Sequence, residues 1–481
     1  MFNREQMVAE IAKEVVARLQ SHMNGAATAE QAAPPTGADG IFETVDDAVK
    51  AAAEAQKKVV ALSLEDRGRM ISIIRGLCES RKQEFAKLEL DETGLGRLDH
   101  KIQKLEIVKN VLGIEAMRSD ARTDTYGMCL IERAPWGVIG MVLPATHPIP
   151  TMASNAINVI AAGNTAVFSP HPVGAKAACY ALQVFNRAIR KELGIADALA
   201  TVREPSIRSA EEIFKHPGIA LLCVTGGPAV VRAAGKHGKR VIAAGPGNPP
   251  VVVDETADLD AAARDIIKGG SFDNNLLCIG EKEIFVVKSV ADAFKAAMKK
   301  AGAFELDAEA IDRLTKAAFE FKGDYGGGCG HGHLKRDLIG KDVSVLAAAA
   351  GVHVPAGTDM LFGETTADHA FVVEEQMMPF IPMVRVGCID AAIRESLKAE
   401  HGYRHTALIH SRNIDNVTKM AKAMNTTLFV HNAPCAAALG GEGAGYLSFS
   451  IATPTGEGIT TPLTFTRERQ LTVGRGGFRI I

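Results

Sequence analysis

The chain of 481 residues has few aromatic residues, almost no net charge and no long apolar run. Aromatic residues make up 5% of it, with Trp136 as the single tryptophan. This low content argues against a β-sandwich whose core is packed around aromatic residues. The 46 glycines instead favour tight βα turns and helix-covered parallel sheets. The formal net charge of −2 gives no reason to expect a nucleic acid or an anionic membrane as partner. No uncharged apolar run reaches the ~18 residues that a membrane span needs.

The eight cysteines form no Cys-x-x-Cys pair and are scattered along the whole chain. The first twenty residues include Glu5, Glu10 and Glu14, which argues against a signal peptide and against an acidic-poor transit peptide. Scattered cysteines without a signal peptide are typical of a cytoplasmic protein with reduced thiols. The 47% hydrophobic and 23% charged residues are those of an ordinary folded chain, with room for two to four domains of about 100–200 residues.

Residues 1–20 predict an amphipathic helix, and residues 21–40 predict a flexible linker rich in Ala, Gly and Pro. The apolar residues of the helix recur at helical spacing: Val8, Ile11, Ala12, Val15 and Leu19. A single helix of about 18 residues is marginal alone and needs a surface that covers its apolar face. That surface is either the protein itself or a sister subunit, a groove on another protein, or a membrane; the acidic residues argue against the membrane.

From about residue 41, helical patterns give way to short buried strands that alternate with helices. Strands are predicted at 138–143, 165–169, 219–224, 241–244, 251–253, 284–287, 408–410 and 428–430. This alternation predicts an α/β fold with doubly wound parallel sheets. We expect two α/β lobes, a first over 41–255 and a second over 256–445. The strand-like tail 446–481 is expected to pair with another sheet, either in the same chain or in another subunit.

Cys278 is the cysteine whose local sequence favours a reactive thiol. It lies in SFDNNLLCIGEKE, in a polar turn that precedes an apolar strand. Cys179 and Cys223 lie inside a helical stripe and an apolar run, where a thiol packs rather than reacts. Cys278 is therefore the candidate nucleophile, and a satisfied, semi-buried thiol is the alternative.

The segment NNLLCIGEKE (274–283) resembles the nucleophile loop of CoA-acylating members of the aldehyde dehydrogenase superfamily. Further matches follow in the same order as in that family: ETGLGRLDHKIQK (92–104), PWGVIGMVLP (135–144), AAGNTAVFSPHP (161–172), VTGGPAVV (224–231), AAGPGNPPVVVD (243–254), EHGYRHTALIHS (400–411) and TPTGEGITTPLTFTRER (453–469). The chain looks most similar to the acylating dehydrogenases of bacterial microcompartments, which act on propionaldehyde or acetaldehyde.

The resemblance implies a domain plan and a set of partners. A nucleotide-binding domain at 41–255 and a catalytic domain at 256–445 are both Rossmann-like. Segment 121–133 and the tail 446–481 contribute to an oligomerisation sheet, so a homodimer or homotetramer is expected. Helix 1–20 targets the enzyme to a microcompartment shell protein through the linker 21–40. The expected location is cytoplasmic, inside a microcompartment, with no nucleic acid or membrane partner.

The resemblance also implies an activity. The chain is expected to oxidise a short-chain aldehyde to acyl-CoA through a thioester on Cys278, with hydride transfer to NAD and CoA as acyl acceptor. Propionaldehyde is the first expected substrate and acetaldehyde the next, although no single residue in the sequence separates the two. The alternatives are a hydrolytic or phosphate-using aldehyde dehydrogenase, and a non-catalytic microcompartment cargo protein.

Ala244 stands where hydrolytic relatives carry the Glu of a Glu-Leu-Gly-Gly motif, which acts as general base for water. Alanine cannot accept a proton, and general-base help is typically worth ~10²–10⁴-fold, so water attack on an enzyme thioester should be slow. The thiol of CoA is partly ionised near neutral pH and needs less help. The residue at this position therefore favours CoA over water.

The cofactor contacts that the resemblance implies are Ser169, Pro170, His171, Gly226, Gly227, Ala244, Gly245 and Glu375. Gly226 and Gly227 follow a strand and open a helix, where phosphate can approach backbone N–H groups; a plain tight turn is the alternative. Ser169, Pro170 and His171 replace a Lys-Pro-x-Glu pattern, which leaves a more open ribose pocket and no preference for NAD over NADP. Glu375 matches the Glu that holds the nicotinamide ribose in the family.

Thr146 aligns with the asparagine of the family's oxyanion site, so its hydroxyl and the backbone N–H of Cys278 are the candidate donors. The neighbouring His147 either tunes the thiol or lines the aldehyde pocket. The Gly-rich segment 326–333 contains Cys329, His331 and His333, but a closed zinc site needs a fourth ligand. We therefore predict no metal site and interpret this segment as a flexible surface insertion.

Overall fold

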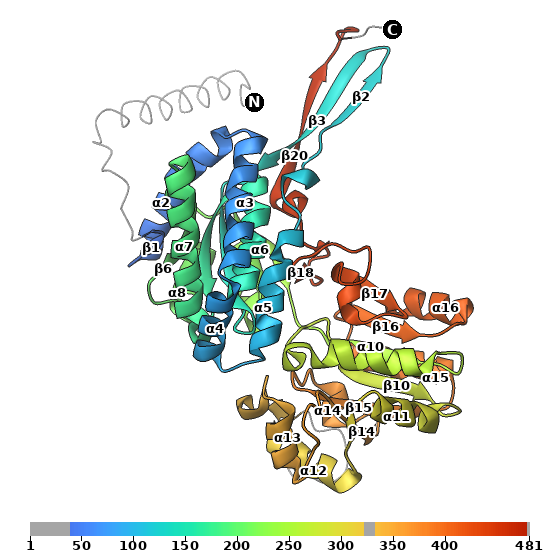
Figure 1. Ribbon diagram of the computed structural model, residues 1–481. Coiled ribbons are helices and arrows are strands. Elements are labelled where there is room, and N and C mark those ends of the chain that lie inside the picture. Colours follow the sequence, from blue (N-terminus) through green and yellow to red (C-terminus); the bar gives the residue numbers. More distant parts are fainter. Residues whose placement is uncertain (1–38, 322–331, 479–481) are drawn as a thin grey trace, which may run out of the picture. The chain divides into compact units, whose positions relative to one another are not determined.

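The computed structural model describes residues 39–321 and 332–478, and Figure 1 shows their helices and strands. The predicted targeting helix 1–20, nearly all of the linker 21–40, and Cys329 and His331 lie outside the described residues. No helix within the described ranges is long and apolar enough to cross a membrane.

The first lobe is built on a six-stranded parallel sheet with the order β1-β6-β5-β4-β7-β8. Its strands are β1 (Ile41–Phe42), β4 (Val138–Leu143), β5 (Thr165–Pro170), β6 (Leu199–Val202), β7 (Leu221–Thr225) and β8 (Arg240–Ala244). Every residue of β4 and β5 is buried, as expected for a parallel sheet covered on both faces. The continuous apolar runs predicted β4, β5, β7 and β8 to within two residues.

Helices cover both faces of this sheet. They are α2 (Val45–Ala61), α3 (Leu64–Ser80), α4 (Lys82–Thr93), α5 (Leu98–Ile107), α6 (Pro148–Ala161), α7 (Ala175–Leu193), α8 (Ile207–Lys215) and α9 (Pro228–Ala234). Helices α2 and α8 pack with Val138 and Val142, whereas α3, α6 and α7 pack with Ile139 and Met141. Alternate residues of one strand thus serve opposite faces. Helix α6 is buried along its whole length, whereas the turn that leads into it from β4 is half-buried at Pro144–Thr146 and buried at His147.

The second lobe contains a seven-stranded parallel sheet with the order β11-β14-β15-β10-β9-β16-β17. The strands are β9 (Pro250–Val253), β10 (Glu283–Val287), β11 (Phe304–Glu305), β14 (Leu361–Thr365), β15 (Phe380–Val386), β16 (Thr406–His410) and β17 (Leu428–His431). The helices are α10 (Leu259–Ser271), α11 (Ala291–Lys300), α12 (Ala308–Ala318), α13 (Val343–Ala350), α14 (Ala370–Val373), α15 (Ile389–Ala399) and α16 (Ile414–Met424). Two doubly wound parallel sheets confirm the predicted α/β fold.

Strand β9 corrects the expected division of the chain between the two sheets. Its apolar run was expected to belong to the first lobe, which we placed at 41–255. The strand instead pairs with β10 and β16, so the change from one sheet to the other falls between Ala244 and Pro250. The sequence pattern identifies β9 as a buried strand. Its pairing partners depend on the tertiary fold, and the local sequence carries no information about them.

A third, three-stranded antiparallel sheet joins β2 (Asp120–Asp124), β3 (Gly127–Pro135) and β20 (Thr466–Val473). In Figure 1 this sheet carries the red end of the chain next to the cyan β2–β3 hairpin. All of β2 and most of β20 are exposed. The tail is not one strand, however. Its first part forms β18 (Ile451–Ala452) and β19 (Gly458–Ile459), and Leu447 packs in the core of the first lobe.

Candidate active site

The segment before Cys278 has an unusual backbone. After α10, the short helix η5 (Phe272–Asn275) contains three successive left-handed residues: Asp273, Asn274 and Asn275, with φ of 49°, 56° and 63°. Asp and Asn are the residues, apart from glycine, that tolerate this conformation best. We call 273–278 the nucleophile turn. The strained backbone therefore explains why the sequence has a polar Asp-Asn-Asn run at this place.

Each of the three left-handed residues is held by a different part of the structure. Asp273 Oδ1 accepts from the backbone N–H of Arg97 at 2.8 Å. Asn274 Nδ2 donates to Asp342 Oδ1 at 2.8 Å. Lys282 Nζ donates to the backbone oxygen and to Oδ1 of Asn275, both at 2.6 Å. Strain of this kind persists only where surrounding contacts fix it, and such sites are often functional.

Cys278 lies half-buried at the wall of a cavity of about 250 Å³. His147 and Lys104 from the first lobe line the same cavity, as do Cys435 and Phe449 from distant parts of the chain. The cavity walls are mainly apolar. Burial and the nearby charge of Glu375 raise the pKa of the Cys278 thiol to about 12, against the opposing influence of Lys282. The cavity is of a size for a small organic substrate next to a thiol.

His147 stands at the turn between β4 and α6, with its ring 5.9 Å from that of Phe449. Burial, together with the charges of Lys104 and Lys101, lowers the pKa of His147 well below its usual value. The imidazole is therefore neutral at physiological pH, and its Nδ1 has no hydrogen-bond partner among the described residues. A neutral ring in this wall shapes the cavity and offers one polar atom to a ligand.

Thr146 is the neighbour of His147 but does not itself line the cavity of Cys278. The contact that fixes it is to its backbone: Lys101 Nζ donates to the Thr146 carbonyl oxygen at 3.3 Å. The structure thus brings Cys278 and His147 to one cavity and leaves the half-buried Thr146 outside its lining.

Glu375 lies close enough to Cys278 to act on its charge. It follows α14, and burial raises the pKa of its carboxyl to about 7, with Lys282 and a hydrogen bond from the Gly247 backbone opposing that rise. Lys282 links this segment to the nucleophile turn, because Gln376 Nε2 donates to the Lys282 carbonyl oxygen at 2.8 Å. One buried lysine therefore holds both the turn before the thiol and the segment that carries Glu375.

The predicted nucleotide contacts lie at the carboxyl ends of strands in the first sheet. Gly226 follows β7, and its N–H donates to the Ala244 carbonyl oxygen at the end of β8, at 3.0 Å. A Cβ on the exposed Gly227 would meet nothing within 4 Å, whereas one on Gly245 would meet Pro454 at 2.8 Å. The carboxyl edge of a parallel sheet is where nucleotides bind in doubly wound folds. Gly227 is open and Gly245 is closely packed.

Three further predicted contacts lie at the end of β5. Ser169 and Pro170 are buried, and His171 is exposed. His171 Nδ1 accepts from the N–H of Val173 at 3.2 Å, so this imidazole caps its own turn. The structure therefore brings seven of the predicted residues to the ends of β5, β7 and β8, and places Glu375 with Cys278.

Several residues of the site were missed from the sequence: Lys101, Lys104, Asp273 and Lys282. Lys104 and Lys101 are spaced i, i+3 on α5 and are each 1% exposed. Burial of His405 lowers its pKa to about 4, and a Cβ on Gly247 would lie 3.0 Å from its ring. Charged residues on a helix usually face water, so sequence spacing gave no sign that these lysines are buried.

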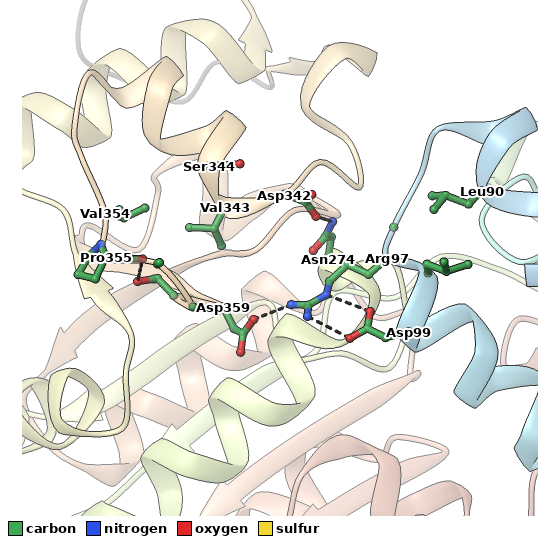
Figure 2. A pocket seen from close by; sticks show the side chains of 15 residues that line it. Leu90, Arg97, Asp99, Asn274, Asp342, Val343, Ser344, Val354, Pro355 and Asp359 are labelled. Atoms are coloured by element: carbon green, nitrogen blue, oxygen red, sulfur yellow. Dashed lines mark hydrogen bonds and ion pairs between the residues drawn. The ribbon is translucent and has the colours of Figure 1, made fainter. Parts of the chain in front are cut away.

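A second cavity, of about 480 Å³, opens on Asn274 of the nucleophile turn. Figure 2 shows Arg97 between Asp99 and Asp359, to which its guanidinium is bound. The wall mixes polar and apolar residues and holds no cysteine. Nothing here resembles a metal centre: across residues 39–321 and 332–478, no three His, Cys, Asp or Glu side chains gather as a metal site would need.

Two parallel α/β lobes, with a cysteine on a strained turn and a nucleotide-type sheet edge, define a two-lobed oxidoreductase that uses a thiol. The chain belongs to the aldehyde dehydrogenase family, whose model matches residues 24–306. It is 43% identical over 479 residues to acetaldehyde dehydrogenase (acetylating) EutE of Salmonella typhimurium, covering 99% of this chain and 100% of that one. This confirms the resemblance to acylating members that the sequence motifs indicated.

Solved structures agree with the family and the fold. One is a propionaldehyde dehydrogenase of Rhodopseudomonas palustris with bound CoA and an acylated cysteine, with TM-score 0.87 and 40% identity, covering 91% of this chain and 98% of that one. Another is a propionaldehyde dehydrogenase from the fucose utilisation bacterial microcompartment of Clostridium phytofermentans, with TM-score 0.88 and 38% identity, covering 92% of this chain and 100% of that one.

Proposed function

We propose that this chain is a CoA-acylating aldehyde dehydrogenase that oxidises a short-chain aldehyde through a thioester on Cys278. The observation that carries the proposal is the place of Cys278, at the wall of an apolar cavity and directly after a turn of three left-handed residues. A backbone held in this conformation by three separate anchors presents one thiol in one orientation. The family membership of the chain supports the same assignment.

The covalent steps follow from the chemistry of the thiol. The Cys278 thiol loses its proton to solvent, the sulfur forms a bond to the aldehyde carbon, and the carbonyl π bond breaks so that the oxygen becomes an oxyanion. The backbone N–H of Cys278 and the hydroxyl of Thr146 are the donors proposed for that oxyanion. Loss of hydride leaves an acyl group on the sulfur. The CoA thiolate then attacks the acyl carbon, and the Cys278 thiolate leaves.

The residues at the sheet edge suit a nicotinamide dinucleotide, which when bound supplies the hydride acceptor. Gly227 ends the turn after β7 with no side chain to cap α9, and nothing lies within 4 Å of where its Cβ would be. A phosphate can therefore approach the backbone there. Glu375, on the segment beside Cys278, is the proposed ligand of the nicotinamide ribose. Both features leave NAD and NADP equally acceptable.

Ala244 supports CoA rather than water as the acyl acceptor. It is buried at the end of β8 and offers no group that could take a proton from water. Without a base, hydrolysis of the thioester loses help typically worth ~10²–10⁴-fold, whereas a thiol is already partly ionised. The acyl enzyme should therefore persist until CoA arrives.

The test is an assay of the purified protein with aldehyde and NAD, with and without CoA. Sustained NADH formation only with CoA, and its loss in Cys278→Ala, is the expected result. Sustained NADH with release of free acid in the absence of CoA would contradict the proposed acceptor. A panel of C2 to C5 aldehydes plus lactaldehyde, with both nicotinamide cofactors, identifies the substrate; propionaldehyde and acetaldehyde are the first to compare.

We also propose a microcompartment location and an oligomer. A relative at 38% identity belongs to a bacterial microcompartment, and the amphipathic pattern of residues 1–20 suits docking on a shell protein. Deleting residues 1–20 should leave activity intact and release the protein from purified shells. The exposed sheet of β2, β3 and β20 is the proposed contact of a homodimer or homotetramer, and deleting β20 should yield monomers in analytical ultracentrifugation.

A further inference from the structure

Four charged side chains are buried together where the first lobe meets the nucleophile turn. They are Glu89 on α4, Lys101 and Lys104 on α5, and Asp273, each at most 2% exposed. We call them the four-charge cluster. It contains two cations and two anions, so it is neutral as a whole. Buried ion pairs often stabilise a fold no better than apolar residues would, so stability alone explains such a cluster poorly.

On one side, the cluster holds the turn between β4 and α6. Glu89 Oε2 accepts from the backbone N–H of Ile149 at 3.1 Å, and Lys101 Nζ donates to the Thr146 carbonyl oxygen at 3.3 Å. Glu89 and Lys101 are themselves paired at 2.8 Å. The side chain of His147, the residue before α6, makes no cap for that helix, so Glu89 supplies the cap from another helix.

On the other side, the cluster holds the nucleophile turn. Lys104 is bound to Asp273 Oδ2, and Lys101 Nζ lies 3.8 Å from the same oxygen. Asp273 is the first of the three left-handed residues and lies five positions before Cys278. Lys101 therefore contacts both sides, the Thr146 backbone and the nucleophile turn.

We propose that the four-charge cluster is a positioning device that holds the Thr146 hydroxyl and the Cys278 backbone N–H at a fixed separation. The inference rests on the proposed function, in which both groups donate to one substrate oxygen. The two donors lie on different lobes and far apart in the sequence, so their separation needs a link of this kind. A misplacement of about 1 Å at such a site can cost about 10²-fold in rate.

The test uses Asp273→Asn, which keeps the shape of the side chain and tolerates a left-handed backbone but removes the charge. The first turnover without CoA, followed as a burst of NADH, should slow by about 10²-fold. The KM for aldehyde should change by less than about threefold, because ground-state binding is retained. Alkylation of Cys278 by iodoacetamide needs no oxyanion donor and should change little. Lys87→Met, which breaks an exposed pair with Asp91 on α4, is the control and should leave all three unchanged.

A double variant separates positioning from stability. Asp273→Asn alone leaves Lys104 buried without its partner and should lower the melting temperature, whereas Asp273→Asn with Lys104→Gln should restore much of it. A double variant that melts near the wild type but still shows a slow burst supports the proposal. A wild-type burst in that variant, or alkylation that slows in parallel with the burst, would overturn it. If the wild-type protein itself shows no burst of NADH, the proposed function is wrong, and the positioning proposal that rests on it is wrong too.

Discussion

Gly247 lies against the carbonyl oxygen of Cys278 so closely that a Cβ at Gly247 would be 2.5 Å from that oxygen. The same Cβ would lie 3.0 Å from the ring of His405. Backbone and a buried ring cannot give way as a flexible side chain can. Position 247, in the segment between β8 and β9, therefore has to be glycine for the nucleophile turn to keep its place.

Gly247→Ala is expected to displace Cys278 rather than merely to destabilise the fold. Overpacking of this kind typically costs about 1–3 kcal/mol of unfolding free energy. A shift of the nucleophile should also lower kcat by as much as about 10²-fold with a smaller change in KM. Thermal melting and steady-state kinetics measure the two effects. Gly387→Ala, where a Cβ meets nothing within 4 Å, is the control; equal kinetics in both variants would contradict the argument.

A second prediction concerns Lys282 and the ionisation of the nucleophile. The positive charge of Lys282 lowers the pKa of the Cys278 thiol, against burial, which raises it. In Lys282→Met the apparent pKa of the thiol should rise by on the order of one unit. The pH dependence of Cys278 alkylation should therefore move to higher pH, and the rate at neutral pH should fall. Lys288→Met, at an exposed residue just after β10, should leave the profile in place. An unmoved profile in Lys282→Met would show that its charge does not reach the thiol.

More of the fold than of the candidate site could be predicted from the sequence. Val138–Leu143 is a continuous apolar run and the run from Thr165 is mostly apolar, so run length and composition identified both as buried strands. Strand β15 was missed because Pro382 lies inside it, and proline normally argues against a central strand. Strand β14 has only five residues and contains Gly363, which weakens its signal.

Cys278 could be proposed as the nucleophile from its polar turn, whereas the residues that hold this turn could not be predicted. Asp273, Asn274 and Asn275 read locally as an ordinary turn, and nothing in their order reveals three left-handed residues in succession. Their partners come from distant segments: Arg97 and Lys104 from one lobe, and Asp342 from another part of the chain. Burial of a lysine depends on where its helix packs, and that information is tertiary.

Glu281 predicts a specific dependence of stability on pH. Burial raises the pKa of its carboxyl from the ordinary value of 4.5 to about 7. The folded state thus binds more protons than the unfolded state between these pH values, and stability falls as pH rises through this window. Because the pKa differs by about 2.5, the loss above pH 7 amounts to roughly 3 kcal/mol.

Glu281→Gln should remove this contribution. Relative to the wild type, the variant should gain stability between pH 4.5 and pH 7 in urea unfolding, because a neutral amide has no proton to lose. Its side-chain oxygen can still accept from the Cys435 N–H, which lies 2.9 Å from the carboxylate. Glu309→Gln, at a side chain that is 89% exposed, is the control and should differ from the wild type equally at every pH. A pH-independent difference for Glu281→Gln would contradict the prediction.

The last prediction tests whether the residue at position 244 decides between water and CoA as the acceptor of the acyl group. In Ala244→Glu a carboxylate is placed at the position that the sequence resemblance aligns with the base of hydrolytic relatives, so we expect release of free acid without CoA to rise by as much as about 10²-fold. Ala244→Gln has nearly the same volume but cannot accept a proton, and it should stay as slow as the wild type. Because Ala244 is 3% exposed, both variants should lose stability to a similar extent, and melting temperatures check this. Acid release that rises equally in both would mean that a looser site, rather than a base, admits water. A rise confined to Ala244→Glu would establish that the missing carboxylate is what preserves the thioester for CoA.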